Sequence, residues 1–434
     1  MIKLLKSITA PLFSLAIVMV AVGLFSTFVP LRLALDGHSP FIIGGVTAAY
    51  FAGLVVGSLK TEAFISRVGY IRAFAALASL TSAIAILMGM IIKPYLWLCL
   101  RFSMGAFTAG IFIVIESWLL VVGGKERKGT ILAFYMIAFY AAQSGGQFLL
   151  NVAPPLSFIP FSLATLFISL SVLPVCLTRY SSPSLEEPSL LSPFQLFKIS
   201  PFGIFSSFGS GLIMGAFFGL APVFAHKVGM VTSEVATYMG VTIIGGFILQ
   251  WPLGKLSDHI NRRSVLIGVA FITSILGALI ALASVVSTNF LFILAILFGG
   301  FSFTMYPLSI SYTNDYLDPK DLVAATGGLL VAYGVGSVIG PLVAPVAMLL
   351  MGPAGLYVYF SLMAAMVGGF GVYRKRYKRP ISLSEQVEYR PVPGTTPIVS
   401  ELDPRANEKE HEVEASSKSH EEGSIHESAE ETTV

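Results

Sequence analysis

The residues best placed to do chemistry in this chain are a few charged side chains at the ends of long apolar runs. The loop 254–263 has the sequence G-K-L-S-D-H-I-N-R-R, in which Asp258 lies between Gly254 and the adjacent pair Arg262 and Arg263. A carboxylate and two arginines this close together can form ion pairs at helix ends, and arginines beside an apolar span mark the positive side of a membrane. The chemistry that this spacing indicates is electrostatic gating.

An earlier loop, 60–72, is a looser copy of this pattern. Glu62 takes the place of the aspartate, and Arg67, Gly69 and Arg72 supply the basic part. Other features recur at the same offset of roughly 195–199 residues: Gly57 aligns with Gly254, and Glu116 aligns with Asp315. The sequence therefore predicts two related halves.

Two further carboxylates, Glu116 and Asp315, lie at matching positions near the ends of apolar runs. In one interpretation they carry a proton or part of the substrate. In the other they latch a cytoplasmic gate by pairing with arginines of the nearer loop, and the pairs separate as the halves move. The expected pairs are Glu116 with Arg67 or Arg72, and Asp315 with Arg262 or Arg263.

Arg101 is the one basic residue deep inside an apolar run, about 9 Å from its outer end at 1.5 Å per residue. A charge at that depth usually faces the protein interior. It could attract an anionic substrate group, couple to a proton carrier, or brace the fold by donating to carbonyls of the first helix. No acidic residue lies at a comparable depth.

Composition explains what positions these residues. The chain has 434 residues, of which 55% are hydrophobic and 12% charged, about half the charged fraction of a soluble protein. Its mean hydropathy is +0.80. Runs of roughly 20 apolar residues can each span a bilayer as a helix. Twelve such runs predict an all-α polytopic membrane protein, with spans near 8–31, 41–59, 73–92, 95–120, 129–152, 157–178, 201–225, 233–254, 264–286, 289–313, 322–349 and 353–373.

The polar linker 179–200 divides these spans into two six-helix bundles, residues 1–178 and 201–379. Before Pro380 there are 23 basic and 11 acidic side chains, and the cations gather at the termini and in alternate loops. This pattern predicts that both termini face the cytoplasm, and it is unlike a nucleic-acid footprint. Residues 380–434 carry 13 acidic and 4 basic side chains, and their composition predicts a disordered acidic cytoplasmic tail.

Several motifs support a family resemblance. The loop 254–263 resembles the G-x-L-x-D-x-x-G-R-R signature of the major facilitator superfamily (MFS), with Asn261 in place of a glycine, a residue that also tolerates positive φ. Arg101–Gly105 is similar to the family's R-x-x-x-G motif. The combination of 247–258, 115–119, 306–308, 314–317 and 332–334 is similar to its YcaD-like branch. The resemblance implies the MFS fold of twelve helices, transport by rocking of two halves, a chain that functions as a monomer, and an Asp258 that caps a neighbouring helix.

By the same resemblance, the first, fourth, seventh and tenth helices line a central cavity with help from the second, fifth, eighth and eleventh. Most polar side chains on those helices are uncharged hydrogen-bonding or aromatic groups, which suit a small polar or amphipathic organic solute. Taken one at a time, each is better explained as a helix–helix hydrogen bond or a packing residue; the cavity is inferred from the set as a whole. The cavity candidates are Ser26, Thr27, Tyr50, Arg101, Tyr140, Gln143, Gln147, Gln250, Trp251, Tyr306, Tyr312, Asn314 and Tyr333.

These observations predict a secondary transporter of a small organic solute in the bacterial inner membrane. The sequence contains no Walker-type phosphate loop, which argues against ATP as the energy source. A proton gradient is the simplest driving force, and no cofactor other than the coupling proton is expected. Because no carboxylate lies at mid-membrane, uniport also stays open. The alternatives are efflux of toxic amphipathic compounds and a non-transporting sensor or scaffold. An enzyme is not expected, since no metal-ligand cluster or nucleophile–base pair is evident.

Overall fold

The computed structural model describes most of the predicted membrane domain and a few positions of the C-terminal tail. The described residues are 2–123, 127–177, 191–283, 288–317 and 321–376, with 383, 386, 389, 391 and 394–396 in the tail. Within these residues all of the regular structure is helical. The all-α prediction is confirmed.

The first half contains seven α-helices and one short 3-10 segment. α5 is continued by the 3-10 segment η2, and α6 and α7 follow one another as a single rod. The elements are α1 (Ile2–Leu35), α2 (Pro40–Val68), α3 (Tyr70–Met90), α4 (Pro94–Gly123), α5 (Lys128–Gln147), η2 (Phe148–Asn151), α6 (Ile159–Leu170) and α7 (Val172–Cys176).

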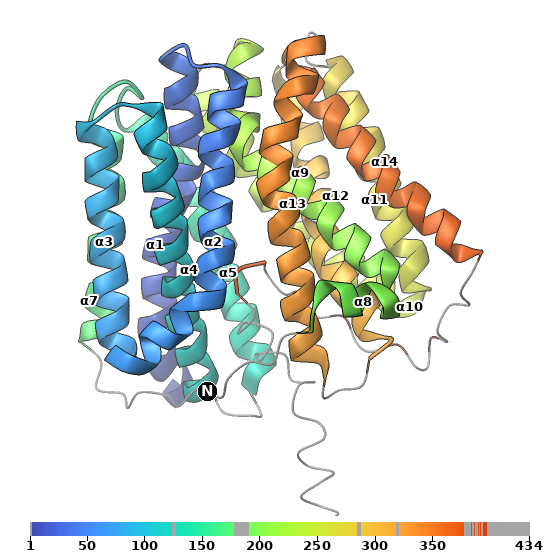
Figure 1. Cartoon of the computed structure of the whole chain (residues 1–434), viewed down its shortest axis with the longest axis horizontal. Coiled ribbons are helices and arrows are strands. Elements are labelled where there is room, and N and C mark those ends of the chain that lie inside the picture. Colours follow the sequence, from blue (N-terminus) through green and yellow to red (C-terminus); the bar gives the residue numbers. More distant parts are fainter. Residues whose placement is uncertain are drawn as a thin grey trace, which may run out of the picture.

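The second half begins with a short helix inside the predicted linker and continues with six long ones. They are α8 (Pro193–Ile199), α9 (Pro201–Lys227), α10 (Thr232–His259), α11 (Arg262–Ala283), α12 (Thr288–Asn314), α13 (Leu322–Met351) and α14 (Gly355–Lys375). Figure 1 shows α1–α7 gathered on one side and α8–α14 on the other. The exact domain boundaries stay predictions.

Eleven helices of the described chain are long and apolar enough to cross a membrane, counting α6 and α7 together. The predicted span that is not among them is 129–152, which corresponds to α5. This helix is more polar, and its Tyr135, Tyr140, Gln143 and Gln147 are buried among other helices. It packs along α1 in its own half and α10 in the other. Its polar side chains face protein, which accounts for their presence in a predicted span.

Glycines set the closest helix contacts. α2 lies against α4 so tightly that a Cβ on Gly53 would come within 1.9 Å of the Phe102 carbonyl oxygen. α9 and α13 approach in the same way in the second half, where a Cβ on Gly211 would lie 2.0 Å from the Tyr333 carbonyl oxygen. Small residues at such crossings let helix backbones touch, which is how helices associate in membranes.

The two halves pack together at the end of the bundle that carries the α1–α2 turn, here called the distal end. Gly44 of α2 lies against Pro341 of α13, where an added Cβ would come within 1.9 Å of the carbonyl oxygen. The Ser144 hydroxyl of α5 donates to the Gly240 carbonyl of α10 at 3.0 Å. The opposite end, here called the proximal end, carries the turn at Gly69. The charged loops and the described tail residues lie there.

Candidate functional site

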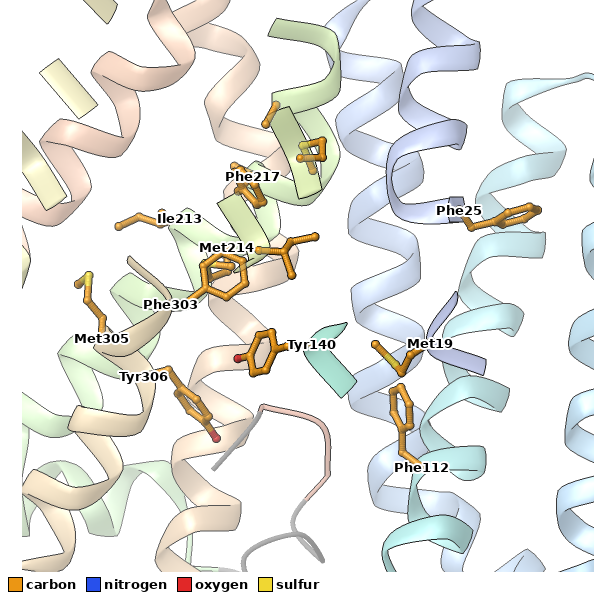
Figure 2. Packing of buried hydrophobic residues seen from close by; sticks show 14 of the residues in the cluster. Met19, Phe25, Phe112, Tyr140, Ile213, Met214, Phe217, Phe303, Met305 and Tyr306 are labelled. Carbon is orange, nitrogen blue, oxygen red and sulfur yellow. The ribbon is translucent and has the colours of Figure 1, made fainter. Parts of the chain in front are cut away.

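Helices of both halves enclose a central cavity of about 160 Å³. Its walls come from α1, α2, α4 and α5 on one side and from α9, α12 and α13 on the other. In Figure 2, Tyr140 from the first half faces Phe303 and Tyr306 from the second, and the ring centroids of Tyr140 and Phe303 lie 6.3 Å apart. Seven of the predicted residues line this cavity: Ser26, Tyr50, Arg101, Tyr140, Gln143, Tyr306 and Tyr333.

Arg101 is the buried charge of the cavity wall. Its guanidinium carbon lies 4.3 Å from the centre of the Tyr50 ring, and Nη1 lies 3.5 Å from the Met104 sulfur. Its Nε is buried and has no hydrogen-bond partner among the described residues. No hydrogen bond from Arg101 to a carbonyl of α1 is found in the described helices, so the predicted brace is not formed. A cation–π contact leaves most of the guanidinium donors available to a ligand.

Glu116 is fully buried near the proximal end of α4, and its partners are hydroxyl groups. Tyr135 of α5 and Thr395 of the tail each donate to Oε1 at 2.6 Å, and Thr396 donates to Oε2. The predicted pairing with Arg67 or Arg72 is wrong in this conformation, since both arginines are exposed to solvent. Glu116 therefore accepts hydrogen bonds inside the protein and is not part of an ion pair with those loops.

Arg262 is the centre of an ionic network that joins α10, α11 and α12. Its Nη1 lies 2.5 Å from Oδ1 of Asp315, and its Nη2 lies 2.7 Å from Oδ1 of Asp258. The neighbouring Arg263 donates to the Tyr316 hydroxyl at 3.0 Å. Asp315 thus has the arginine partner that its spacing indicates. The Arg262 side chain is only 1% exposed, so its guanidinium group is shielded from solvent.

Family comparison identifies the architecture. A family model described as "Major Facilitator Superfamily" matches residues 12–305 and 203–405. The chain belongs to the major facilitator superfamily. It is therefore a multi-pass membrane protein and a secondary transporter, and it is not an enzyme.

Relatives and solved structures agree with the MFS assignment. The uncharacterized MFS-type transporter YcaD of Escherichia fergusonii is 32% identical over 332 residues, covering 75% of this chain and 85% of the relative. A second uncharacterized MFS-type transporter, from Enterobacter sp. (strain 638), is 30% identical over 331 residues with the same coverage. The crystal structure of the nucleoside transporter NupG superposes with a TM-score of 0.70, covering 86% of this chain and 99% of that one. A bacterial homologue of the lysosomal transporter Spinster, captured inward-facing and unoccupied, gives 0.63 over 93% and 98%. These structures are 13% and 12% identical to the chain and share its fold.

The MFS signature loop departs from its expected geometry at two residues. Asn261 does not use positive φ; its side-chain oxygen accepts from the Ser264 backbone NH at 3.3 Å, which caps the start of α11. Asp258 accepts from the backbone NH of Tyr389 at 2.8 Å, so the predicted capping of a neighbouring helix is replaced by a contact with the tail. The loop's charges are thus tied to the C-terminal segment.

The matching MFS loop of the first half keeps the turn, but its two arginines are exposed. Gly69 separates α2 from α3 with φ of +84°, a conformation that favours glycine. Arg67 and Arg72 point to solvent, while Glu62 is half-buried. The two halves therefore differ at the proximal end.

The other six predicted cavity residues, including Thr27, do not line the cavity. Trp251 is 67% exposed on the outer face of α10, beneath the Lys255 ammonium group, so its assignment to the cavity is wrong. Gln147 bonds with Thr27 and with the Gly23 carbonyl, joining α5 to α1. The remaining three are buried but do not line the cavity: Gln250, Tyr312 and Asn314.

Sequence reasoning missed the contribution of the tail to the cavity. Gly394 and Thr395 line it, and Figure 2 shows the C-terminal chain passing close to Tyr140 and Tyr306. The tail as a whole has the composition of a solvated segment, yet Tyr389 and Thr396 are buried. One signal was available: Tyr389–Val399 contains no acidic residue, although the tail around it is rich in them.

Proposed function

We propose that this transporter carries a small organic solute with an anionic group, and that protons drive the movement. The observation that carries the proposal is Arg101, a buried guanidinium in the cavity wall. Its described contacts are to Tyr50 and Met104 and include no carboxylate. A buried cation without an acidic partner is costly, and binding an anion offsets that cost.

The rest of the wall suits the body of such a solute. Aromatic rings from both halves surround the cavity, and Tyr306 and Tyr333 lie with ring centroids 4.5 Å apart. Gln143 and Ser26 add uncharged hydrogen-bonding groups. Pockets of this kind bind an apolar or aromatic body and fix its orientation with a few polar contacts. A multiply charged phosphate ester fits less well, because Arg101 is the only basic residue in the described lining.

The test of the substrate class uses purified protein in liposomes that contain a pH-sensitive dye. Pools of organic anions, neutral solutes and organic cations are offered under an imposed proton gradient. We expect uptake from the anion pools, lost at least tenfold in Arg101→Gln and partly kept in Arg101→Lys. Lys93→Gln removes a cation from the exposed start of the same helix and should transport normally. Equal transport by Arg101→Gln and the parent would refute an anionic substrate.

Glu116 is the proposed proton carrier. It is fully buried, and its described hydrogen-bond partners are the hydroxyls of Tyr135, Thr395 and Thr396. A buried carboxylate without a cation partner can take up a proton at small cost, which suits coupling. We expect Glu116→Gln to abolish solute-dependent proton movement, while Glu234→Gln, a change near the distal end, leaves it intact. Unchanged proton movement in Glu116→Gln would exclude this carboxylate as the carrier.

The proposed location is the cytoplasmic membrane of a bacterium, with both termini in the cytoplasm and a single chain as the working unit. The bacterial relatives support the membrane, and the positive charge of the alternate loops supports the orientation. The proximal end would then face the cytoplasm, and the cavity in this structure would be inward-facing. No feature of the described residues favours efflux over uptake. Family membership favours transport over a sensor or scaffold.

A further inference from the structure

Two described residues of the C-terminal segment are buried in the bundle at the proximal end. Tyr389 is 6% exposed and Thr396 is 1% exposed, although the segment around them has the composition of a solvated tail. We propose that the proximal end of the cavity is a binding site for a peptide, and that Tyr389 and Gly394–Thr396 belong to the chain's own occupant of it. This occupant would hold the transporter in an inhibited state.

One side of the site belongs to the second half of the molecule. The backbone NH of Tyr389 donates to Asp258 Oδ1 at 2.8 Å, and the Tyr389 ring lies against Gly254. A Cβ added to Gly254 would come within 2.0 Å of the ring carbon Cδ1, so a larger residue there would displace the tyrosine. Two signature-loop residues thus bind Tyr389: Gly254 contacts its ring, and Asp258 accepts from its backbone NH.

The other side of the site belongs to the first half. The hydroxyls of Thr395 and Thr396 donate to the two oxygens of Glu116, and Tyr135 donates to the same carboxylate at 2.6 Å. Two adjacent hydroxyls on one carboxylate are a specific arrangement, since each oxygen has its own donor. The peptide therefore joins the halves through Asp258 on one side and Glu116 on the other.

Between these anchors the segment forms part of the cavity wall. Gly394 lies against the rings of Tyr333 and Tyr306, where an added Cβ would be 3.1 Å from Tyr333 Cε1 and 3.3 Å from Tyr306 Cε1. Gly394 and Thr395 both line the central cavity. At the distal end the halves are already packed through Gly44 and Pro341. A solute that moves toward the proximal end meets the segment, and the halves cannot close there while it occupies the gap.

Charge explains why this part of the tail is the occupant. The tail carries 13 acidic side chains from residue 380 onward, but Tyr389–Val399 carries none. An acidic segment would be repelled by Glu116 and Asp258, whereas a segment of hydroxyls, prolines and one arginine is accepted. The site thus recognises a peptide that lacks acidic residues and offers paired hydroxyl donors.

The first experiment measures access to the cavity and needs no identified solute. A cysteine is introduced at the lining residue Ser58 in a protein whose native Cys99 and Cys176 are replaced by alanine. Its reaction with a charged maleimide is compared in the full chain, in a chain that ends after Arg379, and in one that ends after Ser400. We expect labelling to be at least fivefold faster in the shorter truncation and unchanged in the longer one, which keeps the segment. The same cysteine placed at exposed Ser66 should react equally in all three.

The second experiment separates binding from transport. A synthetic peptide of residues 384–400 is added to the chain that ends after Arg379, and binding is followed by fluorescence anisotropy. We expect saturable binding that protects Ser58→Cys from the maleimide, and at least tenfold weaker binding when both threonines are valine. Equal labelling of the two truncations together with no saturable peptide binding would overturn the proposal. Because neither measurement involves solute, failure of the proposed anion transport leaves this result interpretable.

Discussion

Removing Asp315 takes one of two carboxylates away from a guanidinium that is shielded from water. The side chains of Arg262 and Asp315 are 1% and 2% exposed, whereas Asp258 is 24% exposed. Breaking a buried pair by removing one partner costs about 3–5 kcal/mol, and a solvent-exposed pair is worth about 0.2–1 kcal/mol. Since Arg262 keeps Asp258 in the Asp315→Ala variant, we expect the lower end of the first range, about 3 kcal/mol. Asp258→Ala should cost about 1 kcal/mol or less.

The assay is thermal unfolding of the purified protein in detergent, with folded fraction followed for the parent and both variants. For a folding unit of 150–250 residues, about 2 °C of Tm is lost per kcal/mol, so Asp315→Ala should lower Tm by about 6 °C. Asp258→Ala should lower it by about 2 °C or less. A loss of Tm in Asp258→Ala that equals or exceeds the loss in Asp315→Ala would refute the argument that burial decides the value of these pairs.

Three further predictions follow from close contacts and from one phenol. Gly53→Val should prevent correct folding, measured by a monodisperse chromatography peak, because an added Cβ meets the α4 backbone; Gly268→Val, where the Cβ meets nothing within 4 Å, should fold. Gly44→Leu should force the distal end apart at Pro341 and raise labelling of cavity cysteines from the distal side, and unchanged labelling would contradict this. Burial raises the pKa of Tyr389 well above its usual value, so the seated tail requires the neutral phenol. Peptide binding should then be constant up to about pH 9 and weaken above about pH 10, where the free phenol ionises, and a loss between pH 6 and 8 would contradict it.

The sequence alone was sufficient for the helical architecture because bilayer physics acts on length and composition. A run of about 20 apolar residues becomes a spanning helix whatever its neighbours are. One predicted span, α5, is not apolar enough to be counted among the membrane-spanning helices. The reason is a tertiary contact, which the sequence alone does not reveal. Gln147 of α5 bonds to Thr27 and Gly23 of α1, so protein and not lipid surrounds that face.

The rotation of each helix about its axis was harder to predict. Gln250 and Trp251 are neighbours in α10, so they point about 100° apart. Gln250 is buried and Trp251 is largely exposed. Because α10 carries apolar residues around its whole circumference, no amphipathic stripe indicates which face meets the protein. Polar residues on such a helix can therefore be assigned to the membrane interior but not to a particular face.

Partners across the two halves depend on conformation, which local sequence does not specify. Arg262, Asp258 and Asp315 lie at the ends of α10, α11 and α12, which pack together within one half, so their pairing follows from the fold of that half. Glu116 has a matching position in the first half, yet besides Tyr135 its hydrogen-bond partners are residues 395 and 396, about 280 positions away. The tail is acidic overall, so its composition does not indicate that residues 389–399 lack acidic side chains and can approach Glu116.

Acidic residues of both halves bind the tail at the proximal end in this structure. Oδ1 of Asp258 accepts both from Arg262 Nη2 at 2.7 Å and from the Tyr389 backbone at 2.8 Å. Both carboxylate oxygens of Glu116 accept hydrogen bonds from the tail while the tail is bound. Closing the proximal end requires the two halves to meet where Tyr389, Thr395 and Thr396 now lie, so these residues must leave first. Their departure exposes Glu116 to the proximal side at the same moment as the cavity opens, which would link relief of inhibition to protonation of the proposed carrier.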